Sequence, residues 1–228
     1  MSPNHPNPDS PAFPTESAEV RLPGPVGVLE LACDVPDVDA ARAGTAVICH
    51  PHPEHGGTMH NKVVTIIERS LRELGLATVR FNFRGVGASA GSYDEGNGES
   101  DDLAAVVEWA RRQRPGTALW LAGFSFGAYV ALRCAARLEA DQLILVAPPV
   151  GRWNFDGIEP PACPTLIVQG EADEVVDAPA VFAWAETLDP EPAVVRMEET
   201  GHFFHRRLMD LRGALKNALR NHLPAREA

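Results

Sequence analysis

The chain has 228 residues, of which 45% are apolar, and its 31 acidic residues against 20 lysines and arginines give a net charge of −11. This length and composition suit one α/β domain with a sizeable core, or two small ones. The acidic balance, which no basic run interrupts, excludes a broad surface for nucleic acid or for an anionic membrane.

The N-terminal segment is not expected to be a secretory signal. Residues 1–14 are rich in Pro, Asn and Ser and have no basic stretch followed by an apolar core. No run approaches the ~20 apolar residues of a membrane span. We therefore expect a cytoplasmic protein without a membrane partner. Its expected parts are a flexible N-terminal tail (1–19), a single domain (20–223) and a C-terminal tail (224–228).

The four cysteines, at positions 33, 49, 134 and 163, form no C-x-x-C pair. Cys49 lies in an apolar run and Cys134 in a helix-like segment. Both are predicted to be small buried hydrophobes rather than disulfide partners or zinc ligands.

After the tail, short apolar runs alternate with amphipathic segments, which is typical of a mostly parallel sheet covered by helices. The predicted strands are residues 26–32 (an edge strand), 45–50, 76–83, 117–122, 142–146, 165–169 and 193–197. The predicted helices are residues 61–74, 101–114, 126–138, 178–188 and 204–223. The pattern predicts one doubly wound α/β domain with about seven strands and helices on both faces.

Two connections limit what the domain can hold. Residues 84–98 contain five glycines but neither a phosphate-binding loop nor a dinucleotide-binding motif, and Arg84 there is predicted to be structural rather than substrate-binding. Residues 147–164 are short and contain five prolines, so they leave no room for a large cap domain. An open, shallow site is the expected consequence.

The strongest chemical signal is the segment 123–127, Gly-Phe-Ser-Phe-Gly, which matches G-x-S-x-G between a predicted strand and a predicted helix. A tight turn in that position presents the hydroxyl of Ser125 above the sheet, and glycines on both sides remove Cβ atoms that would collide. The alternative is a glycine-lined turn that holds an unreactive serine. We favour Ser125 as a nucleophile.

A serine nucleophile needs a histidine base and an acid that orients it, in the chain order Ser, Asp or Glu, His. His202 follows the strand 193–197 and precedes the last helix, whereas His205 is expected inside that helix. Asp173 follows the strand 165–169 at the carboxyl edge of the sheet, where an open α/β sheet places its site. Three carboxylates, Glu171, Asp177 and Asp156, remain alternatives to Asp173.

An oxyanion hole would use the backbone N–H of Phe126 and a second donor from the loop 50–57. Pro51 and Pro53 lack an N–H, which favours His52. The same loop allows a competing interpretation, because His50, His52, His55 and His60 lie within eleven positions and such clusters can bind zinc or copper. Their spacing matches no helical metal motif, so we expect no metal and no cofactor.

Together these residues resemble a compact bacterial branch of the α/β-hydrolase superfamily, similar to dienelactone-hydrolase-like esterases. The matching segments are residues 49–53, 56–59, 61–64, 81–87, 123–127, 170–176 and 201–204, within a resemblance that spans about 26–219. The resemblance implies cofactor-free hydrolysis with Ser125, Asp173 and His202 as the triad. Dienelactone hydrolases proper use a cysteine where this chain has Ser125. The resemblance specifies neither the substrate nor the oligomeric state.

The resulting hypothesis is a serine esterase that cleaves carboxylic esters of small molecules through an acyl-enzyme. An acyltransferase, a thioesterase or a peptidase would use the same residues. A non-catalytic or histidine-cluster metal-binding protein on the same scaffold is the alternative of another class.

Overall fold

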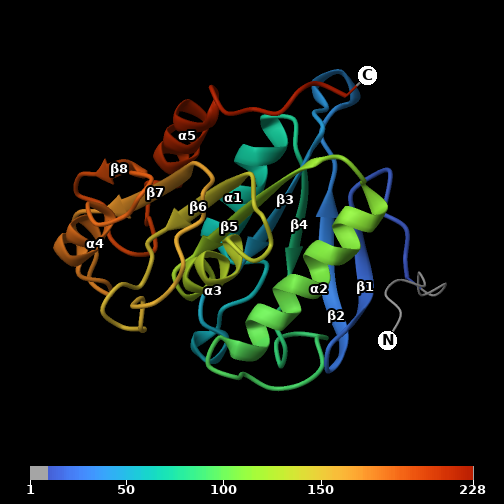
Figure 1. The fold of residues 1–228 in the computed structure, drawn as a ribbon, viewed down its shortest axis with the longest axis horizontal. Helices are drawn as coiled ribbons and strands as arrows, with labels where there is room; N and C mark the ends of the chain where they lie inside the picture. Colours follow the sequence, from blue (N-terminus) through green and yellow to red (C-terminus); the bar gives the residue numbers. More distant parts are fainter. Residues whose placement is uncertain (1–9, 228) are drawn as a thin grey trace.

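The computed structural model describes residues 10–227, which contain one eight-stranded sheet in the order β1-β2-β4-β3-β5-β6-β7-β8 (Figure 1). The strands are β1 Ala18–Gly24, β2 Gly27–Asp34, β3 Gly44–Cys49, β4 Ala77–Phe81, β5 Ala118–Phe124, β6 Gln142–Val146, β7 Thr165–Gly170 and β8 Ala193–Met197. β1 and β2 pair antiparallel to their neighbours, and every other pair is parallel. The predicted α/β class is confirmed, with eight strands rather than about seven.

Helices cover both faces of the sheet. Helices α1 Lys62–Glu73 and α5 Leu208–Leu219 pack on one face, and α2 Asn97–Gln113, α3 Phe126–Ala135 and α4 Ala178–Ala185 pack on the other (Figure 1). Alternate residues of the central strands enter the two cores. In β5, for example, Leu119 and Leu121 face α2 and α3, whereas Trp120 and Ala122 face α1 and α5. This alternation explains why the central strands are continuously apolar.

The sequence pattern does not reveal β1. Its presence corrects the predicted position of the next strand, β2, in the sheet. Residues 26–32 are not an edge strand, because β2 lies between β1 and β4. Val20 and Leu22 of β1 are buried while Arg21 between them is exposed, as expected for a strand with one covered face. With only two buried side chains, followed directly by Pro23, this alternation is weak in the sequence.

Two helices begin elsewhere than the sequence predicts. α2 starts at Asn97 instead of residue 101, because Glu99 accepts hydrogen bonds from the N–H groups of Asp94 and Gly96 and caps the first turn. α5 starts at Leu208 instead of residue 204. His205 therefore lies in an exposed turn before the helix and not within it.

Both ends of the described chain contact the domain. Phe13 stacks on Trp109 of α2 with ring centroids 5.4 Å apart, and the Trp109 indole donates to the Pro11 carbonyl. Part of the segment predicted as a flexible tail (1–19) is thus packed, and residues 1–9 lie outside the described residues. In the predicted C-terminal tail, the Ala225 carbonyl accepts from the N–H of Ala43.

The connection between β6 and β7 carries no helix, only turns and an isolated bridge between Val150 and Trp153. No cap domain therefore covers the carboxyl end of the described sheet. Within residues 10–227, no helix is both long and apolar enough to cross a membrane.

Candidate active site

Ser125 occupies a strained turn between β5 and α3. Its φ of 53° and ψ of −121° place it in a conformation that L-residues rarely adopt. Its N–H donates to the Val146 carbonyl of β6, and its own carbonyl accepts from Ala128 at 2.8 Å. The backbone is thus held on both sides, and the hydroxyl makes no capping bond to the helix, which leaves it available for another partner.

The structure brings three predicted residues into one hydrogen-bonded chain. His202 Nε2 lies 3.0 Å from Ser125 Oγ, and His202 Nδ1 lies 2.8 Å from Asp173 Oδ2. The side chains of His202 and Asp173 are 3% and 0% exposed, so bulk water does not compete for the bond between them. The arrangement allows His202 to accept a proton from the serine while the carboxylate fixes the ring.

Asp173 is saturated with hydrogen bonds. Its Oδ1 accepts from the N–H groups of Val175 and Val176, and its Oδ2 accepts from Gln169 Nε2 as well as from His202. Burial by itself would raise the pKa of Asp173, but the hydrogen bond from His202 and those from the backbone outweigh burial and hold the pKa below its ordinary value. The carboxyl is therefore a carboxylate at neutral pH.

Two glycines let the loops of Asp173 and His202 approach each other. An added Cβ on Gly170 would lie 2.2 Å from the Thr200 carbonyl oxygen, and one on Gly201 would lie 2.5 Å from a carboxylate oxygen of Glu174. That same Glu174 oxygen accepts the N–H of His202 at 3.1 Å. Glu174 thus holds the backbone of the histidine.

The three carboxylates that were alternatives to Asp173 are not part of the hydrogen-bonded chain from Ser125 through His202 to Asp173. Glu171, Asp177 and Asp156 are exposed, and Asp177 occupies the N-terminal cap position of α4. None of the three has a hydrogen bond to His202 among the described residues.

Of the two predicted oxyanion donors, one lines the pocket of Ser125 and the other directly follows Ser125 in the sequence. Phe126 is the first residue of α3, and His52 lines a cavity of about 110 Å³ together with Ser125 and His202. Their rings are 5.2 Å apart. No hydrogen bond of residues 10–227 uses the N–H of either residue, so both are available to a ligand.

His50 has a structural position that the sequence does not indicate. Its Nε2 accepts the N–H of Phe83 at 3.1 Å, which leaves Nδ1 to donate to the Pro51 carbonyl at 2.6 Å. Burial lowers the pKa of His50 to about 4, so the ring is neutral at physiological pH. The ring ties the loop that carries His52 to the end of β4.

The histidine cluster does not assemble into a metal site in the part of the chain that the structure describes, where no group of three His, Cys, Asp or Glu side chains is placed to hold an ion. His52 and His55 stack on each other with centroids 4.3 Å apart. Burial and the neighbouring His55 lower the pKa of His52. These rings form one wall of the pocket.

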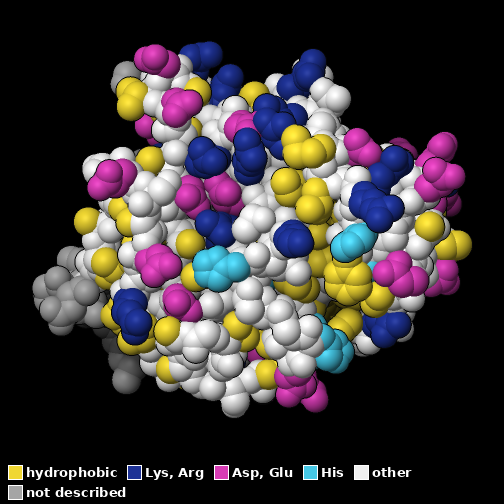
Figure 2. Space-filling view, turned by 180° about the vertical axis from the view of Figure 1, so that it is seen from behind, with side chains coloured by type: hydrophobic (Ala, Val, Ile, Leu, Met, Phe, Trp, Pro, Cys, Tyr) yellow, Lys and Arg dark blue, Asp and Glu magenta, His cyan; other side chains and the backbone are white. Residues whose placement is uncertain are grey.

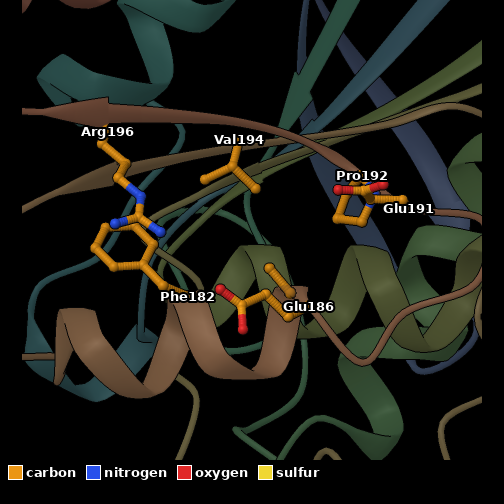
Figure 3. A pocket seen from close by; sticks show the side chains of 7 residues that line it. Phe182, Glu186, Glu191, Pro192, Val194 and Arg196 are labelled. Atoms are coloured by element: carbon orange, nitrogen blue, oxygen red, sulfur yellow. The ribbon is translucent and has the colours of Figure 1, made fainter.

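Of the phenylalanines near Ser125, one lines the pocket. Phe124, Phe126 and Phe204 are fully buried in the core, whereas Phe203 is 54% exposed and stands beside His202. A larger hollow of about 290 Å³ lies between α4 and β8, where Arg196 stacks on Phe182 at 4.0 Å (Figure 3). It shares no lining residue with the pocket of Ser125.

Arg84 lies behind the site rather than in it. Its guanidinium donates hydrogen bonds to both carboxylate oxygens of the fully buried Asp102, and its own side chain is 9% exposed. The pair ties the glycine-rich connection to α2, which agrees with a structural role.

Comparison with known proteins gives matches of sequence and of fold. A family model described as serine aminopeptidase, S33, matches residues 42–162, a span that contains His52 and Ser125 and ends before Asp173 and His202. An uncharacterized protein of Rickettsia prowazekii is 32% identical over 187 residues, covering 78% of this chain and 79% of that protein.

Two solved structures are also similar over nearly their whole length. XC6422 from Xanthomonas campestris, described as an α/β serine hydrolase without lid, is 59% identical with a TM-score of 0.92, covering 96% of this chain and all of that one. An α/β serine hydrolase homologue from Coxiella burnetii is 46% identical with a TM-score of 0.88, covering 91% of this chain and all of that one.

Proposed function

Because this chain belongs to the serine aminopeptidase S33 family, within the α/β-hydrolase superfamily of serine hydrolases, we propose that it cleaves carboxylic esters of small molecules. The observation that carries the proposal is the hydrogen-bonded chain from Ser125 through His202 to Asp173. Such a chain activates a hydroxyl that is otherwise a poor nucleophile.

In the proposed reaction, Ser125 Oγ attacks the ester carbonyl while His202 Nε2 takes the hydroxyl proton. Asp173 keeps the ring in the tautomer that leaves Nε2 free and stabilises the imidazolium that forms. His202 then gives the proton to the departing alcohol. A water molecule, activated by the same nitrogen, hydrolyses the acyl-enzyme and restores Ser125.

Negative charge develops on the carbonyl oxygen during both attacks. The N–H groups of Phe126 and His52 are the proposed donors to this oxygen, since neither has another partner among the described residues. Phe126 adds the positive end of the α3 dipole. The loop of His52 is held in advance by His50, which favours a preorganised donor.

The proposed substrates are small because the pocket is small. A cavity of about 110 Å³ holds only a few heavy atoms beside Ser125. The exposed ring of Phe203 and the side chain of Val175 add apolar surface to a lining that also contains histidine rings and Asn61. A short acyl group fits this space better than a long chain.

The test is hydrolysis of p-nitrophenyl esters from acetate to octanoate by wild type, Ser125→Ala and Ser17→Ala, with EDTA in a parallel series. Ser17 is exposed and remote from the triad, so its variant is the matched control. We expect Ser125→Ala to lose about 10⁴-fold or more in kcat, with Ser17→Ala and EDTA without effect. Activity that persists in Ser125→Ala would overturn the nucleophile assignment.

A peptidase is the second candidate, because the description of the family names a serine aminopeptidase. Amide cleavage requires the same attack but a poorer leaving group. Aminoacyl p-nitroanilides tested beside the matched esters separate the two activities, and added alcohols as acyl acceptors separate hydrolysis from transfer. Efficient hydrolysis of the anilides that is lost in Ser125→Ala would make this protein a peptidase, even at a lower kcat/KM than for the esters, whereas hydrolysis of the esters alone favours the esterase.

A further inference from the structure

Gln169 is a fully buried polar residue near the end of β7, in contact with the acid of the triad. Its Nε2 donates to Asp173 Oδ2 at 2.9 Å, the same oxygen that faces His202 Nδ1. We propose that Gln169 is a positioning residue, which holds the Asp173 carboxylate in the orientation that activates His202. The inference rests on the proposed function and deepens it.

The hydrogen bonds around Asp173 fix both of its oxygens. The N–H groups of Val175 and Val176 hold Oδ1 at 2.8 and 2.7 Å, so they define where one oxygen lies. Only Gln169 supplies a side-chain donor to Oδ2 besides His202 among the described residues. Without it, the bonds to Oδ1 and to His202 remain, but Oδ2 loses the side-chain donor that fixes its direction toward the imidazole.

Packing does not explain a glutamine at this position. The preceding residues of β7, Leu166, Ile167 and Val168, are buried and apolar. Gln169 Oε1 is buried without a hydrogen-bond partner among the described protein atoms, which costs free energy of folding. An apolar side chain of similar size would avoid that cost. The glutamine therefore needs a reason other than packing, and its hydrogen bond to Asp173 supplies one.

Gln169 also changes the charge that His202 experiences. A donor on Oδ2 stabilises the carboxylate and shares its negative charge, so the carboxylate attracts the imidazolium less strongly. Removal of that donor favours the protonated ring. The acidic limb of the pH–rate profile then moves to higher pH. The other titratable groups near His202 are the same in such a variant. Glu174 still accepts the N–H of His202, and His52 and His55 still line the same pocket.

Gln142 offers a matched control in the neighbouring strand. It is 3% exposed, its Nε2 donates to the carbonyl of the following residue, and its Oε1 is likewise buried without a partner. Gln169 shares all these features. The second bond of Gln142 goes to the Pro164 carbonyl at the opposite end of the sheet. The two glutamines differ in whether they contact the triad.

The experiment measures the rate at which a fluorophosphonate modifies Ser125, from pH 5 to 9, in wild type, Gln169→Met and Gln142→Met. We expect Gln169→Met to react about tenfold more slowly at its optimum, as for the loss of a hydrogen bond to a charged group. The midpoint of its acidic limb should rise by about half a pH unit. Gln142→Met should stay within twofold of wild type with an unchanged midpoint, and circular dichroism checks that all three fold.

Gln169→Glu keeps the shape of the side chain and provides a second variant if the methionine variant does not fold. Its protonated carboxyl can donate to Asp173 Oδ2, whereas its ionised form repels that carboxylate. Its rate relative to wild type should therefore fall as pH rises. Two results would overturn the positioning role. One is a labelling rate and a midpoint in Gln169→Met like those of wild type. The other is a labelling rate of Gln169→Glu, relative to wild type, that does not change with pH.

The probe requires no ester turnover, so the two proposals fail separately. Wild type that is labelled at Ser125 but hydrolyses no ester would refute the ester function and still decide the role of Gln169. Wild type that is not labelled would overturn both, since the triad would then not activate Ser125.

Discussion

At the scale of single residues, the position of Ser125 depends on two backbone approaches that only glycine permits. An added Cβ on Gly123 would lie 2.2 Å from the Gly127 carbonyl oxygen, and one on Gly127 would lie 2.3 Å from the carbonyl oxygen of Cys49. Both obstacles are backbone atoms, which cannot rotate away as a side chain would. The turn and the loop that follows β3 are therefore fixed against each other.

We predict that Gly127→Ala destabilises the protein by about 2 kcal/mol or more, because the new methyl group must displace backbone. Gly213→Ala is the matched control, since Gly213 also lies within a helix and a Cβ there meets nothing within 4 Å. It should stabilise by about 0.5–1 kcal/mol, as alanine does in a helix interior. Urea unfolding of both variants measures the difference, and the same sign for both would refute the steric argument.

The sequence predicts some site residues better than others for a physical reason. Ser125 lies in a local motif, and His202 and Asp173 follow strands whose ends must meet at one edge of the sheet. Gln169 and Glu174 act through side-chain contacts that exist only after the loops fold together. The only early sign of Gln169 is one polar side chain at the end of an apolar strand.

At the scale of elements, a charge cluster joins α1 to α5. Glu73, near the end of α1, accepts hydrogen bonds from Arg69 of the same helix and from Arg212 and Lys216 of α5. Burial opposes ionisation, but the bonds from Lys216, Arg212 and Arg69 prevail and lower the pKa of Glu73 to about 2. Beneath the cluster, Leu71 and Leu215 belong to the same apolar core.

We predict that Glu73→Gln lowers the stability at pH 7 by about 1–2 kcal/mol. This is less than the pKa shift alone would give, because the side chain is 22% exposed and salt screens it. Since folding lowers the pKa, the stabilisation is complete above about pH 5 and disappears as pH falls from there toward 2. Thermal unfolding across this range should show the variant and wild type converging at low pH.

Glu108→Gln is the control for Glu73, because Glu108 is 66% exposed and, within residues 10–227, forms an ion pair only with Arg112 on α2. It should change the stability by less than about 0.5 kcal/mol at any pH. An equal effect of the two substitutions would mean that the α1–α5 cluster adds nothing beyond an ordinary surface pair.

The elements themselves differ in how far the sequence predicts them. Strands buried on both faces, such as β3 and β5, give continuous apolar runs. β1 is covered on one face, and only Val20 and Leu22 mark it between polar residues and prolines. Its pairing with β2 is a tertiary contact, which a local sequence pattern does not contain. The sequence therefore predicts β2 as the edge strand, whereas β1 is the edge strand in the structure.

At the scale of the whole molecule, the site is open to solvent. The connection from β6 to β7 has no helix of its own, and its Trp153 packs against Phe126 with tilted rings whose centroids are 5.5 Å apart. Figure 2 shows that lysines and arginines are interspersed with acidic and apolar side chains over the face seen from behind. That face therefore offers no single-sign surface to steer a charged partner.

An open site predicts a simple dependence of rate on substrate concentration. Enzymes with a lid become faster when an interface opens it, whereas this chain has no segment over Ser125 that must move first among its described residues. With tributyrin as substrate, the hydrolysis rate should saturate at concentrations below the solubility limit of tributyrin and should not rise at higher concentrations. Ser125→Ala supplies the background rate. A sharp increase at the limit would show that part of the molecule, such as the exposed Phe203 segment, rearranges at the lipid surface before the ester reaches Ser125.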